Sequence, residues 1–167
     1  MPLLTFHRLR GDKMLIREFT MEDYVQSVEL WKSTPGVGLS RADERDKICA
    51  FLLRNPGLSF VAADEHDAVA GTVLAGHDGR RGFLYHLAVT PAHRGQGLGR
   101  RLAQASLDAL MQQQIAKCHI LVLDSNIGGQ HFWSGLGWQL RDNLLIYSRD
   151  LHAHGSDDGN GSCSCSC

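Results

Sequence analysis

The sequence predicts a single α/β domain of the α+β type, with a mixed, mostly antiparallel sheet of six or seven strands and helices on both faces. Three observations predict this fold. The chain has 167 residues, of which 43% are hydrophobic, and this is enough for one compact core. Strand-like and helix-like segments follow one another in the order β-α-α-β-β-β-α-β-α-β-β. Turn signals lie between neighbouring strand-like segments, which favours antiparallel pairing.

The domain begins with a strand and two helices. Residues 13–19 are strand-like, and Asp23 follows Thr20 by three positions, as in a capping box with Asp in the Glu position. The residues spaced to share one face of the first helix are Tyr24, Val28 and Trp31. Ser40 is placed to cap a second helix, which residues 55–57 (Asn-Pro-Gly) end. The inward residues expected on this second helix are Ile48, Phe51 and Leu52.

The second part of the domain contains most of the sheet. The predicted strands are residues 59–63, 68–75, 83–89, 119–123, 138–140 and 144–148. His66-Asp67 and Asp78-Gly79 supply turns between the first three of these strands. Residues 95–114 form an amphipathic helix, and residues 128–136 form a shorter helix closed by Gly137.

Three segments are expected along the chain. Residues 1–13 carry no clear periodicity and form an N-terminal extension, so that translation could start at Met1 or at Met14. Residues 14–151 form the domain. Residues 152–167 form a Gly-, Ser- and Cys-rich tail that is expected to be disordered and dispensable, although its three cysteines could also bind a soft metal or carry a lipid.

Composition excludes several classes of protein. The formal net charge is −1, so no basic excess favours nucleic acid as a partner. No apolar run approaches the about 18 residues of a membrane span, and the first residues are too few for a signal-peptide core. Cys49 and Cys118 lie in apolar segments, and no Cys/His spacing supports zinc. We therefore expect a cytoplasmic protein without a metal, a nucleic-acid partner or a membrane anchor.

A glycine-rich run lies between the strand at 83–89 and the helix that follows. Its residues are Arg94, Gly95, Gln96, Gly97, Leu98, Gly99, Arg100 and Arg101. The first N–H groups of a helix lack carbonyl partners, and the helix dipole is positive there. Glycines allow a ligand to approach the backbone closely, and the arginines add positive charge. The run therefore predicts a pyrophosphate-binding site.

The glycine spacing argues against two common pyrophosphate loops. A dinucleotide-binding fingerprint needs G-x-G-x-x-G and an acidic residue about 20 positions later. Here Arg100 stands at the position of the third glycine, and residues 109–123 contain no Asp or Glu. A Walker A loop needs G-K-[S/T] after its glycines, and that sequence is absent.

The run does match R/Q-x-x-G-x-G/A, and in this it resembles the acetyl-CoA loop of the GNAT acetyltransferase superfamily. The preceding strand is similar to the family's usual lead-in, with the residues Leu87-Ala88-Val89-Thr90-Pro91. The family's second signature, usually Asn…Phe-Tyr-x-x-x-Gly-Phe, is resembled by Asn126 and the run Phe132-Trp133-Ser134-Gly135-Leu136-Gly137-Trp138. The resemblance covers about residues 14–151. Two signatures in the right order make it specific for the family, although not for a substrate.

The resemblance implies where acetyl-CoA binds. The fourth and fifth strands of a GNAT-like sheet splay apart, and the pantetheine arm lies between them. A strand N–H within 87–89 would polarise the thioester carbonyl. The cofactor-binding residues implied are Leu87, Ala88, Val89, Arg94, Gly95, Gln96, Gly97, Leu98, Gly99, Arg100, Asn126, Phe132 and Trp133. Asn126 is also placed to cap the following helix.

Acyl transfer to an amine needs a base, because a free lysine amine has a pKa near ~10.4 and is mostly cationic at neutral pH. Many family members use a Glu early on the fourth strand, where this chain has Phe83. Tyr85 and His86 are the base candidates, His86 because free imidazole titrates near neutrality and Tyr85 because it is expected to share a strand face with Phe83 and Leu87. Further candidates, for which a solvent-facing position is the favoured interpretation, are His77, Asp78, Asp43 and Glu44.

Departure of the thiolate often uses a Tyr as the acid in this family, and Trp133 stands at that position. An indole N–H donates a hydrogen bond but does not give up its proton. A thiol pKa near ~8.5 makes unassisted departure tolerable, and Tyr147 or a water could assist. Cys49 and Cys118 lack an evident His partner, so we expect direct attack in a ternary complex.

The first functional hypothesis is an N-acetyltransferase that moves an acetyl group from acetyl-CoA to a primary amine of a small molecule or a peptide. The acidic residues Asp43, Glu44 and Asp78 would favour a cationic acceptor, and the loops at 34–41 and 142–143 are expected to shape its pocket. A catalytically weak CoA-binding sensor is the alternative, supported by Phe83 and Trp133. A nicotinamide-nucleotide domain is a weaker third hypothesis. A homodimer is an expectation from the family resemblance alone.

Overall fold

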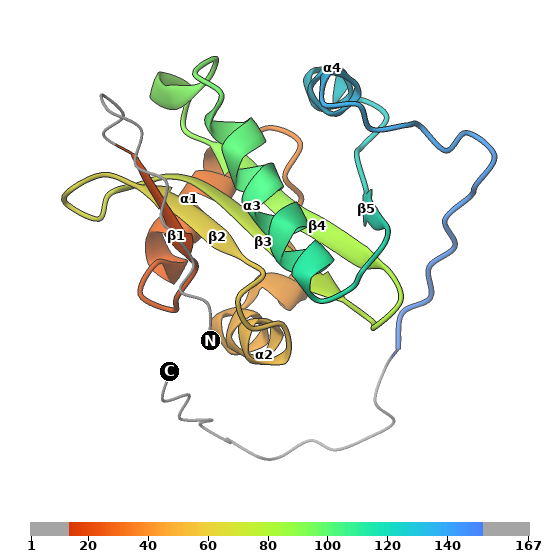
Figure 1. Cartoon of the computed structure of the whole chain (residues 1–167), viewed down its shortest axis with the longest axis horizontal. Helices are drawn as coiled ribbons and strands as arrows, with labels where there is room; N and C mark the ends of the chain where they lie inside the picture. Colours follow the sequence, from red (N-terminus) through yellow and green to blue (C-terminus); the bar gives the residue numbers. More distant parts are fainter. Residues whose placement is uncertain (1–13, 152–167) are drawn as a thin grey trace.

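Helices cover both faces of a five-stranded sheet in the computed structural model, which describes residues 14–151 (Figure 1). The elements in chain order are β1 (Leu15–Glu18), α1 (Tyr24–Ser33), the 3-10 helix η1 (Arg41–Asp43), α2 (Arg45–Arg54), β2 (Phe60–Ala63), β3 (Val69–His77), β4 (Gly82–Val89), the 3-10 helix η2 (Pro91–His93), α3 (Leu98–Gln112), β5 (Cys118–Ile120) and α4 (Ile127–Gly135). The predicted extension at 1–13, the tail at 152–167 and the first residue of the first predicted strand lie outside the described residues.

The sheet is mixed and mostly antiparallel, which confirms the predicted fold class. Its strand order is β1-β2-β3-β4-β5, and only the β4–β5 pair is parallel. One core cluster lies under α3, where Leu102 and Leu110 are buried. The other lies under α1 and α2, where Trp31 and Ile48 are buried. The apolar faces predicted from residue spacing therefore face the sheet, as an amphipathic helix requires.

The predicted number of strands was too high for the described residues. Residues 138–140 and 144–148 are not strands in the structure, and Leu145 and Ile146 are mostly exposed. An isolated strand gains nothing without a partner edge. The nearest sheet edge belongs to β5, which is only three residues long. An apolar sequence pattern was therefore not sufficient to make these segments part of the sheet.

The hydrogen bonds that cap the first helices differ in part from the predictions. Ser40 does form a capping box, but with Asp43 and around η1 rather than at the start of α2. Before α1, the side chain of Asp23 accepts a hydrogen bond of 2.9 Å from the backbone N–H of Thr20, which is half of the predicted box.

Asp23 also pairs with Arg17, which reaches it from β1. Both carboxylate oxygens accept guanidinium hydrogen bonds of 2.8 Å, and the Asp23 side chain is only 3% exposed. Burial alone would raise the pKa of Asp23, but the hydrogen bonds from Arg17 and Thr20 outweigh it and lower this pKa below its ordinary value. A carboxyl whose pKa is lower in the folded state stabilises the fold above its unfolded pKa, and this contribution disappears as the pH falls through the folded pKa.

We therefore expect Asp23→Asn to lower the free energy of unfolding at neutral pH by about 2–3 kcal/mol, because it removes the buried charge partner of Arg17 and leaves only the exposed carboxylate of Asp67 beside the guanidinium. The loss should shrink as the pH falls below about 4, where the unfolded chain takes up a proton at Asp23, and it should disappear below the lower pKa of the folded state. Denaturant unfolding from neutral to acid pH measures both effects. Asp46→Asn is the matched control, because its pair with Lys47 is exposed and exposed ion pairs contribute little to stability. Equal effects of the two variants would contradict the prediction.

Candidate active site

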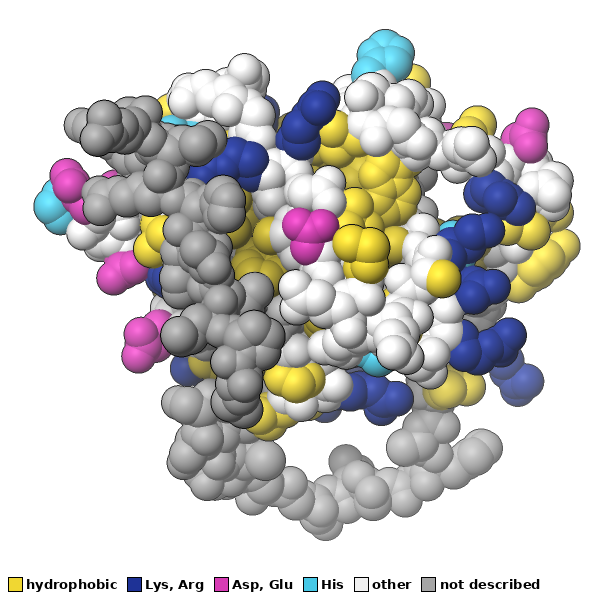
Figure 2. Space-filling view, in the orientation of Figure 1, with side chains coloured by type: hydrophobic (Ala, Val, Ile, Leu, Met, Phe, Trp, Pro, Cys, Tyr) yellow, Lys and Arg dark blue, Asp and Glu magenta, His cyan; other side chains and the backbone are white. Residues whose placement is uncertain are grey.

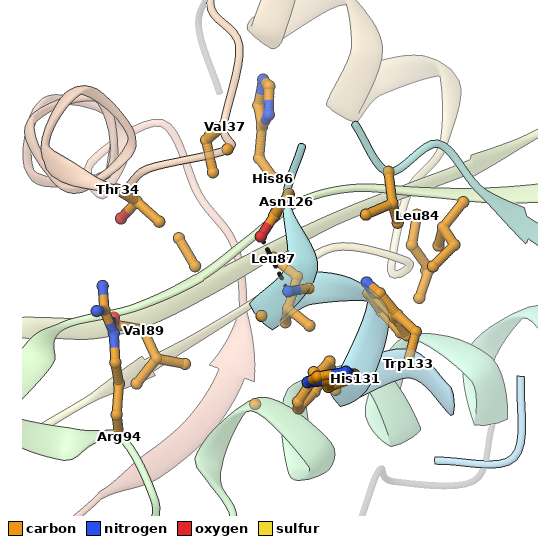
Figure 3. Close-up of a pocket in the computed structure, with 18 of the residues that line it drawn as sticks. Thr34, Val37, Leu84, His86, Leu87, Val89, Arg94, Asn126, His131 and Trp133 are labelled. Atoms are coloured by element: carbon orange, nitrogen blue, oxygen red, sulfur yellow. Dashed lines mark hydrogen bonds between the residues drawn. The ribbon is translucent and has the colours of Figure 1, made fainter. Parts of the chain in front are cut away.

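The strands β4 and β5 separate soon after they begin. They pair only from Gly82 and Cys118 to Leu84 and Ile120, while β4 continues to Val89. This is the parting of the fourth and fifth strands that the family resemblance implies. A cavity of about 930 Å³ opens where they part, between β4, the start of α3, the chain after β5, α4 and the loop after α1 (Figure 3).

The edge of β4 that faces this cavity carries backbone groups not used by the sheet. The N–H of Thr90 bonds to the carbonyl of Ala70 on β3. Because backbone N–H and C=O groups of successive residues in a strand point to opposite edges, those of Leu87 and Val89 point away from β3. The carbonyl of Val89 there accepts a 2.9 Å hydrogen bond from Arg94 Nε. The N–H groups of Leu87 and Val89 therefore lie on the edge of β4 that is not paired with β3.

The glycine-rich loop gives α3 an open N-terminus at the cavity. Gly95 and Gly97 have φ values of 73° and 78°, so the helix begins at Leu98 rather than at residue 95. The first intrahelical bond runs from Arg101 N to the carbonyl of Gly97, and no side chain caps the helix. The N–H groups of residues 98–100 therefore remain available to an anion.

All the predicted cofactor-binding and catalytic residues line the cavity except Gln96. The Gln96 side chain instead donates a 3.1 Å hydrogen bond to the carbonyl of Ala92 and so holds the loop. Phe132 packs against Gly99, where a Cβ would come within 3.3 Å of its ring. Trp133 borders the cavity and contacts Trp138 with ring centroids 4.8 Å apart (Figure 3).

Asn126 connects two walls of the cavity. Its Oδ1 accepts a 2.9 Å hydrogen bond from Gly129 N, so it caps α4 as predicted (Figure 3). Its amide nitrogen lies against Gly36 in the loop after α1, where a Cβ would overlap it. Gly36 and Gly129 therefore enclose this amide, and the loop after α1 contacts the start of α4 across the cavity.

A β-bulge in β4 changes the directions of the catalytic candidates. The pairing shifts between Thr72↔Ala88 and Leu74↔Tyr85, so His86 and Leu87 together oppose one residue of β3. His86 has a φ of 48°, which is uncommon outside glycine.

The expectation that Tyr85 shares a face with Leu87 was wrong because of this bulge. The Tyr85 ring stacks on Phe83, as expected, and contacts Phe51 of α2. Leu87 packs instead against the core under α3.

His86 is held at both its ring and its backbone. Its Nε2 lies 2.5 Å from Asp43 Oδ1, with both side chains 13% exposed, and its ring lies against Trp31 with centroids 4.6 Å apart. Trp31 Nε1 donates to Thr72 Oγ1, which donates in turn to the carbonyl of His86. Because a carboxylate only accepts, we assign the ring proton to Nε2, which leaves Nδ1 with a lone pair and with no hydrogen-bond partner among residues 14–151.

The other catalytic candidates are less suitable. Burial raises the pKa of Tyr85 above its ordinary value, so its phenol stays protonated and is a donor rather than a base. Burial raises the pKa of Cys118 to about 11, which disfavours a thiolate nucleophile. His77 bonds to Gln113, and Tyr147 is 88% exposed and does not line the cavity.

The cavity also contains residues that the sequence did not indicate. His93 and His131 line it, and no spacing pattern in the sequence singles out either residue. Of the two loops expected to shape the pocket, residues 34–38 line it and residues 142–143 do not.

The separation of β4 and β5, together with the cavity beside a glycine-rich loop, is typical of a coenzyme-dependent transferase. Residues 24–138 match the model of the acetyltransferase (GNAT) family, and the chain belongs to this family. This confirms the predicted family and makes the protein an acyltransferase. None of the helices within residues 14–151 has the length and apolar character needed to cross a membrane.

Individual relatives agree with this assignment. An acetyltransferase of Sodalis glossinidius (strain morsitans) is 28% identical over 138 residues, which are 83% of this chain and 96% of the relative. A GNAT-family acetyltransferase of Staphylococcus aureus Mu50 has a TM-score of 0.69 at 20% identity and covers 83% of this chain and 92% of its own. AAC(6')-Iy, solved with the bisubstrate analogue CoA-S-monomethyl-acetylneamine, has a TM-score of 0.66 at 19% identity and covers 84% of this chain and 100% of its own. These structures share the fold.

Proposed function

We propose that the protein transfers an acetyl group from acetyl-CoA to a primary amine by direct attack in a ternary complex. One observation carries this proposal. A single cavity is bordered both by the open N-terminus of α3 and by His86, whose ring is held by Asp43. An anion site would hold the coenzyme, and a positioned imidazole would serve as the base for the amine.

The residues around the cavity fit the coenzyme. The N–H groups of residues 98–100 and the side chain of Arg100 would hold the pyrophosphate, and the space between β4 and α4 would hold the pantetheine arm. Acetyl-CoA, when bound, supplies the thioester. A backbone N–H of Leu87 or Val89 would stabilise negative charge on the carbonyl oxygen, a contribution that is typically about 3 kcal/mol for one donor.

His86 would act as the base. Its Nδ1 takes the proton from the amine as the C–N bond forms and the C–S bond breaks, and the sulfur leaves as a thiolate that is protonated afterwards. Asp43 is a positioning residue that orients the ring through Nε2 and stabilises the imidazolium. Trp133 packs against the acyl-pantetheine arm and donates no proton.

The experiment that tests this function is thiol release from acetyl-CoA with a panel of primary amines, with the acetylated amine identified by mass spectrometry. We expect amine-dependent thiol release and an amide product. CoA binding measured by calorimetry, without release for any amine, would refute the proposal and favour a CoA-binding sensor. The cytoplasmic location and the homodimer stay expectations that this experiment does not address.

A further inference from the structure

The charged side chains that line the cavity are all positive. Among the described residues, no Asp or Glu lines it, and its arginines are Arg94 and Arg100 at the end formed by the glycine-rich loop. That end is the one suited to a pyrophosphate. A second ammonium group on an acceptor would therefore find no carboxylate partner in the cavity, and an unpaired buried charge is strongly disfavoured.

Two of the acidic residues named from the sequence, Asp43 and Asp78, are engaged in hydrogen bonds elsewhere. Asp43 contacts His86 through Oδ1, and its Oδ2 accepts a 2.7 Å hydrogen bond from Ser40 N, so both oxygens already have partners, and Asp43 does not line the cavity. Asp78 accepts the N–H groups of Arg80 and Arg81 in the turn before β4, at the end of the strand opposite Val89. The cationic acceptor expected from the acidic residues thus has no support in the geometry of the cavity.

The part of the cavity away from the arginines is apolar. Leu84 and Val37 border it, and three further lining side chains are unusually exposed for their size: Tyr85 at 40%, Leu121 at 61% and Leu123 at 55%. In the space-filling view, hydrophobic side chains form the floor of the hollow between α3 and α4 (Figure 2). Large exposed apolar side chains among the residues that line a cavity are typical of a site for an apolar ligand.

We infer that the acceptor is a monoamine whose amino group is carried on an uncharged apolar body, and that polyamines and aminoglycosides are poor acceptors. This inference rests on the proposed function and adds the substrate class to it. Apolar surroundings disfavour the ammonium form, so they also favour the neutral amine that attacks the thioester. The imidazole of His86 then has to remove the proton only as the bond forms.

A matched pair of acceptors tests the inference. Hexylamine and 1,6-diaminohexane have the same chain and differ by one terminal amino group. At saturating acetyl-CoA, we expect kcat/KM for hexylamine to exceed that for the diamine by about tenfold or more, because the diamine brings a second charge into the cavity. Equal or better use of the diamine would overturn the inference while leaving the proposed acetyl transfer intact.

A charge introduced into the cavity provides a second test. Leu121 is 61% exposed, so its replacement is not expected to affect folding. Leu121→Glu should shift the ratio of kcat/KM values toward the diamine by about tenfold, whereas the matched control Leu121→Gln should not. An unchanged ratio in the glutamate variant, with both acceptors still used, would contradict the inferred substrate class.

Measurements of amine binding distinguish a failure of this inference from a failure of the proposed function. If neither amine is acetylated, the proposed function fails for these acceptors, and calorimetric titration of each amine into the protein–CoA complex decides the inference. Tighter binding of hexylamine upholds the apolar site. Tighter or equal binding of the diamine, or no binding of either amine, overturns it.

Discussion

The Gly97→Glu variant is expected to bind acetyl-CoA at least about a hundredfold more weakly than the natural chain. Gly97 is the N-cap of α3 and has a φ of 78°. A Cβ there meets no atom within 4 Å, so the new side chain causes no clash in the core. Its carboxylate would instead accept hydrogen bonds from the first N–H groups of the helix and occupy the place of the pyrophosphate with the same sign of charge.

Two alanine variants separate charge from backbone strain. Gly97→Ala carries the left-handed backbone cost of about 1–2 kcal/mol in stability without the charge, and should keep the Kd for CoA within about fivefold. Gly79→Ala has the same kind of cost at a turn outside the cavity and should leave Kd unchanged. Calorimetry gives these values. A glutamate variant that binds CoA as tightly as Gly97→Ala would show that the pyrophosphate does not lie at this helix end.

The His86→Gly variant is expected to lower kcat by about a thousandfold while leaving the Kd for CoA unchanged. Glycine adopts the φ of 48° at the bulge without strain, so the backbone of β4 should keep its course. The change leaves space between Trp31 and Asp43, and added imidazole should restore part of the activity. Steady-state kinetics with and without imidazole measures this, and a thermal melt confirms that the variant folds.

Asp43→Asn tests the positioning role separately. The amide can still contact the ring, but it does not stabilise the imidazolium, so kcat should fall by about ten- to a hundredfold. The KM for acetyl-CoA should stay constant, because Asp43 does not line the cavity. Natural kcat values in both the His86 and the Asp43 variants would refute the assignment of the base.

The features predicted correctly from the sequence are mostly local. The glycine-rich loop and the cap at Asn126 depend on residues a few positions apart, so spacing alone is informative. The turn at Asp78-Gly79 is local in the same sense, since Asp78 Oδ1 accepts from the backbone two and three positions later. The resemblance to a known family then predicted that the glycine-rich loop and Asn126 border the same cavity.

The contact between His86 and Asp43, in contrast, joins residues that are far apart in the sequence. The two residues are 43 positions apart, and they meet because a bulge turns His86 toward the 3-10 helix η1, which ends at Asp43. No residue type marks this bulge, since its positive φ falls on a histidine rather than a glycine. The absence of carboxylates from the described cavity lining was equally hidden, because it depends on Asp43 being engaged by Ser40 and His86.

The side-chain amide of Asn126 lies between Gly36 and Gly129 and holds them apart. The two glycines belong to different segments, and both lie so close to the Asn126 amide that a Cβ at either position would overlap it. The separation of these two walls of the cavity therefore depends on the carboxamide of Asn126. A side chain at either glycine would displace this amide and so change the shape of the cavity without any substitution at His86.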